Sequence, residues 1–141
     1  FAAALAAVAD RFGYGFLLDL RSMPPIPIGQ PGLGARMVLG DHFGVTSGEW
    51  LVDLVLVAAI RLNEPWSRNQ PYAGGHIVRT HGSPRQAIHA VQIEIDRRLY
   101  LTADRLPDSP RVALMARWFA DLVSDVSRAP PATDIMILAA E

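Results

Sequence analysis

The chain has 141 residues, half of them apolar and 19% charged, with a formal net charge of −1 at pH 7. This length accommodates one α/β domain with its own core. A nearly neutral chain without a run of Lys or Arg gives no electrostatic reason to expect nucleic acid or an anionic membrane as a partner. The absence of cysteine excludes disulfides, thiolate metal sites and Cys nucleophiles, and it fits the cytoplasmic location that we expect. The longest apolar run, residues 54–60, is too short to cross a bilayer.

The chain opens with a helical pattern followed by a buried strand. Residues 1–12 place apolar side chains at helical spacing, and Gly13 stands where a helix would end. Residues 14–20 form a short apolar run of the kind found in mostly parallel sheets. Because the chain starts at Phe1 within the helical pattern, we expect it to be a portion of a larger domain.

A proline-rich segment follows the first predicted strand. Residues 21–34, RSMPPIPIGQPGLG, hold four prolines and three glycines, a composition that predicts a long, stiff loop. The loop begins at the carboxyl end of a strand, which is the edge where open α/β sheets bind ligands. A plain connection without a binding role explains the composition equally well.

The next segment predicts a strand, a turn and a helix. Residues 36–39 favour a short strand, and residues 40–44 favour a turn. A helix is expected over residues 49–62, with Thr46 or Ser47 as its N-cap.

The remaining elements alternate between loop, strand and helix. Residues 63–75 predict a loop rich in Pro, Asn and Gly, and residues 76–79 favour a short strand. Residues 88–95 alternate between apolar and polar side chains, which predicts another strand. A long amphipathic helix is expected over residues 111–128, followed by an apolar tail at residues 135–138.

Glu94 is the most notable polar residue of the alternating strand. It shares one face of that strand with Gln92 and Asp96, whereas the intervening residues are apolar. Such a face either meets water or lines a site, and the pattern alone favours water. Arg97 and Arg98 follow directly and are expected to pair with carboxylates or to lie exposed at the strand end.

A second polar concentration lies in residues 71–84, PYAGGHIVRTHGSP. Its paired glycines permit close approach of another backbone or side chain, and Arg79 has the fork geometry that binds carboxylates. The chain has four histidines, none of them in a metal-binding pattern such as HExxH: His42, His76, His81 and His89. Each is therefore expected to be a surface or hydrogen-bonded histidine, and the residues alone leave an α/β hydrolytic or binding domain with an unassigned site.

Three segments of the chain, in the right order, resemble the N-formylglutamate amidohydrolase family. Residues 63–101, NEPWSRNQPYAGGHIVRTHGSPRQAIHAVQIEIDRRLYL, resemble the family pattern of N-x-PY-x-GG, Arg-x-x-Gly-x-Pro and HALQ-E. Earlier, LLDLRSMPP resembles the family's D-x-HSMP, and VLGDHFG resembles its LGD-x-FG. The resemblance covers most of the chain, from about residue 12 to residue 101.

This resemblance implies a zinc-carboxypeptidase-like α/β fold with a mixed, mostly parallel sheet flanked by helices. Residues 1–141 would be the C-terminal portion of a single amidohydrolase domain. The implied reaction is zinc-dependent hydrolysis of N-formyl-L-glutamate, or of a related small-molecule N-acyl amino acid, to the free amino acid. The resemblance makes no prediction of the oligomeric state.

Specific residues inherit expected roles from the matching motifs. Glu94 matches the family's Gln-x-Glu position and would be the general base, while Arg79, Tyr72 and Asn63 would contact the substrate. Arg21 departs from the pattern, because it occupies the position of the family's zinc-binding histidine and a guanidinium has no lone pair to offer a metal. Zinc is therefore expected in the full-length family but doubtful in this chain. The alternative is a non-catalytic homologue that binds an acidic amino acid derivative or a protein partner.

Overall fold

The computed structural model describes residues 1–129. In chain order the helices and strands are α1 (Ala2–Phe12), β1 (Gly15–Met23), β2 (Met37–Gly40), α2 (Glu49–Arg61), β3 (Trp66–Arg68), α3 (His76–His81), β4 (Ile88–Asp96) and α4 (Ser109–Arg128). Two 3-10 turns, Pro84–Gln86 and Arg97–Leu99, flank β4. No helix among residues 1–129 has the length and apolar content needed to span a bilayer.

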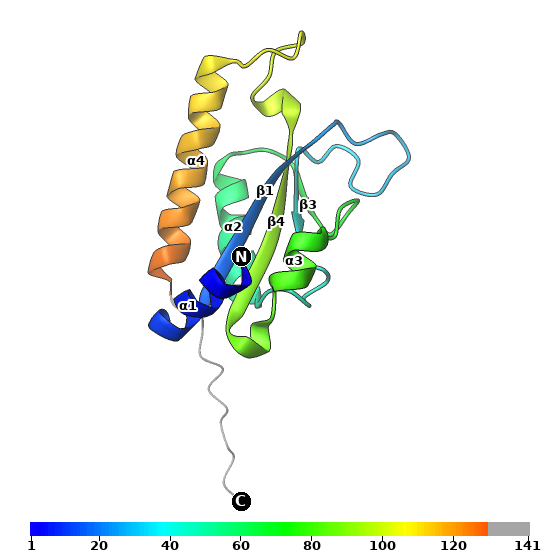
Figure 1. Cartoon of the computed structure of the whole chain (residues 1–141). Coiled ribbons are helices and arrows are strands. Elements are labelled where there is room, and N and C mark those ends of the chain that lie inside the picture. The colour runs from blue at the N-terminus through cyan, green and yellow to red at the C-terminus, as the bar shows by residue number, and fades with distance from the viewer. Residues whose placement is uncertain (130–141) are drawn as a thin grey trace, which may run out of the picture.

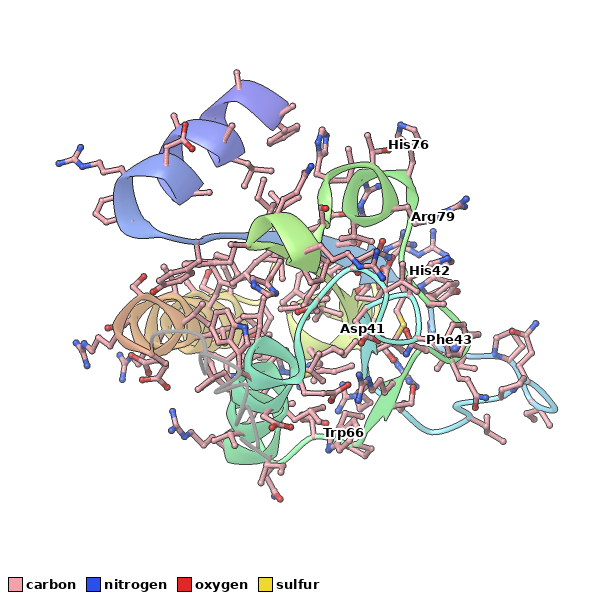
Figure 2. The ribbon with its side chains drawn as sticks, turned by 90° about the horizontal axis from the view of Figure 1, so that it is seen from below. Asp41, His42, Phe43, Trp66, His76 and Arg79 are labelled. Carbon is pink, nitrogen blue, oxygen red and sulfur yellow. The ribbon has the colours of Figure 1, made fainter. Side chains whose placement is uncertain are left out.

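The strands form one mixed sheet in the order β1-β4-β2-β3. β1 and β4 run parallel, with Arg21 opposite Glu94, and β4 and β2 run antiparallel, with Glu94 opposite Val38. β2 and β3 are again parallel. Helices α2 and α4 cover one face of the sheet, whereas α1 and α3 lie on the other (Figure 1; Figure 2). The expected α/β class with a mixed sheet flanked by helices is therefore confirmed.

The main core lies between the sheet and the pair of helices α2 and α4. Val91, Ile93 and Ile95 of β4 all point into it, so the apolar side of the alternating strand faces the core as its pattern predicts. Trp118 of α4 is buried there and donates from its indole Nε1 to the carbonyl of Ala58, at 2.8 Å. This bond satisfies the one polar group that a buried indole carries and fixes α4 on α2.

The helix ends agree with the sequence at α1 but not at α2. Gly13 ends α1 in the left-handed conformation, with φ 83°, as expected. Neither Thr46 nor Ser47 caps α2, because Gly48 is the N-cap and the Thr46 hydroxyl instead donates to the carbonyl of Ala90 at 2.8 Å. The Gly48 N–H donates to Nδ1 of His89 at 2.9 Å, so a buried histidine holds the backbone of the N-cap residue at the start of α2.

Three boundaries differ from the sequence-based expectation. The segment predicted as a loop from residue 21 begins as strand, because β1 continues to Met23 along its partner β4. The predicted loop over residues 63–75 contains the short strand β3, and the strand expected at residues 76–79 is the helix α3. The apolar tail at residues 135–138 lies outside the described residues.

The second face of β4 is largely covered by protein. Gln92 and Asp96 on this face are buried, and Glu94 between them is half-buried. Helix α3 packs over this side of the sheet, next to a small apolar cluster around Met23 and Val38. The expectation of a solvated strand face is therefore wrong, and the polar side chains of β4 line an interior layer.

Candidate active site

Glu94 lies near the carboxyl end of β4, on the face covered by α3. Its neighbours across the sheet are Arg21 of β1 and Val38 of β2. Since β1 and β4 are parallel, their carboxyl ends meet at one edge of the sheet, where α/β proteins most often bind ligands. The residue that the motif match indicates as general base thus lies close to this edge of the sheet.

Burial raises the pKa of Glu94 above its ordinary value. The hydrogen bond from Gln92 and the positive charges of Arg21 and Arg97 oppose this shift, while the charge of Asp19 adds to it. The pKa of Glu94 is raised overall, which brings it closer to neutral pH and makes the carboxylate a better proton acceptor there. A perturbed carboxyl at a ligand-binding edge is typical of an acid–base catalyst.

Gln92 joins Glu94 to the loop that precedes α3. Its Oε1 accepts from the backbone N–H of Gly75 at 2.5 Å, and its Nε2 donates to Oε1 of Glu94 at 2.6 Å. A Cβ on Gly75 would lie 2.9 Å from the Gln92 Oε1, so the second glycine of the pair makes room for this contact. The close approach expected of the paired glycines is therefore observed.

The first glycine of the pair seats the same loop against β2. A Cβ on Gly40 would lie 2.6 Å from the nitrogen of Gly74, and Gly74 has φ 119°, which favours glycine. Two residues after Gly40, the N–H of His42 donates to the carbonyl of Ala73 at 2.7 Å. The close packing of Gly40 against Gly74 thus fixes the position of the start of α3 over β4.

Asp41 anchors the turn that follows β2. Its side chain is fully buried and accepts from Arg68 Nη2 and Asn69 Nδ2, each at 2.6 Å, and from the Gly44 N–H at 3.0 Å. Burial alone would raise the pKa of Asp41, but the bonds from Arg68 and Asn69 together hold it below its ordinary value. Arg68 also bonds Glu49 at 2.7 Å, which links the turn to α2. The sequence did not predict this network, because no local pattern indicates that Asp41 and Arg68, 27 positions apart, form a hydrogen-bonded ion pair.

Arg21 lies beside Glu94 on the neighbouring strand. Its Nε donates to both carboxylate oxygens of Asp19 at 3.1 Å, and its side chain is 49% exposed. Arg97 follows β4 at the same edge and donates from Nε to the Ser22 hydroxyl at 3.4 Å. The guanidinium groups of Arg21 and Arg97 therefore both lie near Glu94, and Arg21 is already paired with the carboxylate of Asp19.

The other predicted substrate contacts are spread over the fold. Tyr72 packs on the apolar cluster around Met23 and Val38, close in the sheet to Glu94. Arg79 is exposed on α3, which Figure 2 shows with His76 beside the turn that carries Asp41, His42 and Phe43. Asn63 follows α2 and lines a hollow with Ile60 and Trp66, among residues of the opposite helical layer. The structure brings Tyr72 towards the base but not Asn63.

The donor set near Glu94 does not by itself fit zinc. No group of three or more His, Asp or Glu side chains within residues 1–129 is arranged to hold a metal ion. Asp19 is paired with Arg21, and the four histidines are scattered, with His89 satisfied at the start of α2. Zinc prefers tetrahedral sites built from imidazole, thiolate and carboxylate, which a guanidinium cannot replace.

Comparison with known proteins places this architecture in one family. The family model described as N-formylglutamate amidohydrolase matches residues 1–101. The N-formylglutamate deformylase of Pseudomonas aeruginosa is 33% identical over 100 residues, which are 69% of this chain and 37% of that protein.

Two solved structures share the fold. The crystal structure of N-formylglutamate amidohydrolase from Ralstonia eutropha JMP134 superposes with a TM-score of 0.77 at 32% identity, covering 88% of this chain and 46% of that one. A protein of Agrobacterium tumefaciens, at 18% identity and a TM-score of 0.58, covers 89% of this chain and 49% of its own, and shows the fold alone. The chain thus spans less than half the length of these relatives. On the match of the family model to residues 1–101, the chain belongs to the N-formylglutamate amidohydrolase family.

Proposed function

We propose that this chain contributes the general base of an amidohydrolase site that cleaves N-formyl-L-glutamate or a related N-acyl amino acid. The observation that carries the proposal is Glu94, a half-buried carboxyl with a raised pKa at the ligand-binding edge of the sheet. The P. aeruginosa relative is named N-formylglutamate deformylase, and the R. eutropha relative is named N-formylglutamate amidohydrolase. Both names support the substrate class.

In the proposed reaction Glu94 accepts a proton from a water molecule as the water oxygen attacks the amide carbonyl. The carbon–nitrogen bond then breaks, and the proton held by Glu94 passes to the leaving nitrogen. The products are the free amine and the carboxylic acid, which is formate for an N-formyl substrate. A raised pKa helps both halves of this cycle, because the group must take up and release a proton near neutral pH.

Several finer expectations stay predictions. Arg79 and Tyr72 are proposed as substrate contacts on the motif match alone, and Asn63 on its place in the same resembling segment, residues 63–101. Zinc dependence would require ligands beyond the donor set described here, and no step above depends on it. We further propose that residues 1–141 are the C-terminal portion of one amidohydrolase domain. We also propose that the protein is cytoplasmic.

The direct test is release of formate from N-formyl-L-glutamate by the purified full-length protein. We expect formate and free glutamate to appear in equal amounts, and we expect N-acetyl-L-glutamate and N-formyl-L-leucine to reveal whether the acyl group or the side-chain carboxylate sets the specificity. Parallel reactions with added zinc or with a chelator measure metal dependence separately. Absence of formate under all three conditions, in a folded protein, would remove the amidohydrolase proposal.

A second candidate function is supported by the placement of Arg21. A guanidinium beside Glu94, with Arg97 close by, suits binding of an acidic amino acid derivative without turnover. Calorimetric binding of N-formyl-L-glutamate that is unaffected by chelator, together with no release of formate, would favour this candidate.

Changing Arg21 to histidine tests the conflict between this residue and zinc. The imidazole would stand between the carboxylates of Asp19 and Glu94, so we expect Arg21→His to bind zinc at least about tenfold more tightly than the parent protein. Zinc titration by calorimetry measures this, with Arg85→His, an exposed change in the turn before β4, as the matched control. Equal zinc affinity of parent and Arg21→His would show that the guanidinium is no obstacle to metal binding.

A further inference from the structure

Gln92 occupies a buried position between the start of α3 and the proposed base. Gln92 is only 5% exposed, and both the oxygen and the NH2 group of its amide form hydrogen bonds. The N–H of Gly75 can only donate, so it fixes which end of the amide is the oxygen. The NH2 group must then point towards Glu94, where a carboxylate can only accept. With the amide reversed, the Gln92 NH2 group would face the Gly75 N–H and the Gln92 oxygen would face the Glu94 carboxylate, and neither pair could form a hydrogen bond.

From this geometry we propose that Gln92 is a positioning residue, which locks one oxygen of the Glu94 carboxylate so that the other is presented to the reacting water. Within residues 1–129 only Oε1 of Glu94 accepts a hydrogen bond, and it does so from Gln92 Nε2 at 2.6 Å. A buried, doubly bonded amide restrains the carboxylate in one rotamer. The inference rests on the proposed role of Glu94 as base.

Gly75 is the second component of this device. The Gln92 oxygen comes within 2.5 Å of the Gly75 nitrogen, and a Cβ at Gly75 would lie 2.9 Å from the same oxygen. An alanine at position 75 would therefore press on the Gln92 amide, whereas no atom of Glu94 lies within 4 Å of the added Cβ. The requirement for glycine here is explained by the reach of the glutamine, and not by backbone conformation, because Gly75 has an ordinary extended φ of −85°.

The titration of Glu94 provides a readout that a purely structural role would not move. Gln92 donates to the carboxylate and so favours its ionised form; hence Gln92→Met, which keeps the side-chain length but removes the donor, should shift the Glu94 midpoint to higher pH. Carboxyl-carbon NMR of the labelled full chain measures this midpoint directly. Gly75→Ala should shift it in the same direction, whereas Gln86→Met, on an exposed residue of the turn before β4, should leave it unchanged.

Turnover supplies the second readout. If the carboxylate is mispositioned, kcat should fall about tenfold or more, with little change in KM, in both Gln92→Met and Gly75→Ala. A Glu94 midpoint and a kcat that match those of the parent in folded Gln92→Met would overturn the proposal. Should Gln92→Met fail to fold, Gly75→Ala measured in the same way decides the question.

The NMR titration needs no catalysis, so the two proposals fail separately. A shifted Glu94 midpoint in a protein that releases no formate would support the coupling of Gln92 to Glu94 while removing the amidohydrolase function. Formate release that is unchanged by Gln92→Met and by Gly75→Ala would support the amidohydrolase function while removing the positioning role of Gln92.

Discussion

Replacing Glu94 by glutamine is expected to reduce formate release by about 10²–10⁴-fold, the usual contribution of a general base, while making the fold more stable. Glutamine has the same shape and can still accept the bond from Gln92, but it cannot take a proton. The loss of activity is measured as kcat/KM with N-formyl-L-glutamate. A Glu94→Gln protein with full activity would show that another residue is the base.

The gain in stability should depend on pH in a defined direction. Because the pKa of Glu94 is raised in the folded protein, the unfolded chain ionises this residue at lower pH, from about its ordinary value of 4.5. The parent protein therefore loses stability relative to Glu94→Gln as the pH rises through the window above 4.5 up to the folded pKa, and the difference is constant beyond that. Urea denaturation of both proteins at several pH values measures it. Asp104→Asn, which removes one negative charge from an exposed residue, is the matched control for the change of charge itself.

Changing Asp41 to asparagine is expected to produce the largest loss of stability. The change removes the charge from a fully buried carboxylate that holds Arg68, Asn69 and the Gly44 N–H. We expect a loss of about 3 kcal/mol, the lower end of the cost of breaking a buried pair, since Arg68 keeps its bond to Glu49. The measurement is the free energy of unfolding in urea at pH 7.

A matched surface change sets the scale for this prediction. Asp125→Asn removes the partner of Arg61 from an exposed pair and should cost less than about 1 kcal/mol. The pKa of Asp41 is lowered in the folded protein, so its contribution is present above the ordinary value of 3.8 and is lost as the pH falls through the folded pKa. The gap between parent and Asp41→Asn should therefore close in strong acid. A gap under 1 kcal/mol at pH 7 would show that the network is dispensable.

Local pattern was sufficient to predict most of the regular elements. The apolar spacing of residues 1–12, the short apolar run after Gly13 and the alternation in β4 each predicted the element that forms. The segment 76–79 was wrongly expected to be a strand, because Ile and Val favour strands and the stretch is short. Its helix forms in context, where the buried Val78 packs against Gly74 and the Gly75 N–H bonds Gln92.

The candidate site was predicted only in part. The motif match singled out Glu94, and alternation placed Gln92 on the same face, but no sequence pattern shows that the Gln92 amide spans from Gly75 to Glu94. The strand β3 was missed because three residues in a Pro-rich and Asn-rich segment are strand only through pairing with β2. Interactions that join distant segments, such as Asp41 with Arg68, depend on the sheet order, which local periodicity does not specify.

Strand β4 carries the proposed chemistry on one side and the main core on the other, in strict alternation. Gln92 and Glu94 face α3, while Ile93 and Ile95 face α2 and α4. A single inserted or deleted residue before Glu94 would turn the carboxylate into the apolar core and expose an isoleucine in the site. Evolution can therefore alter this strand by substitution but hardly by changing its length, and tolerance to substitution should alternate along it, with volume constrained at one position and functional groups at the next.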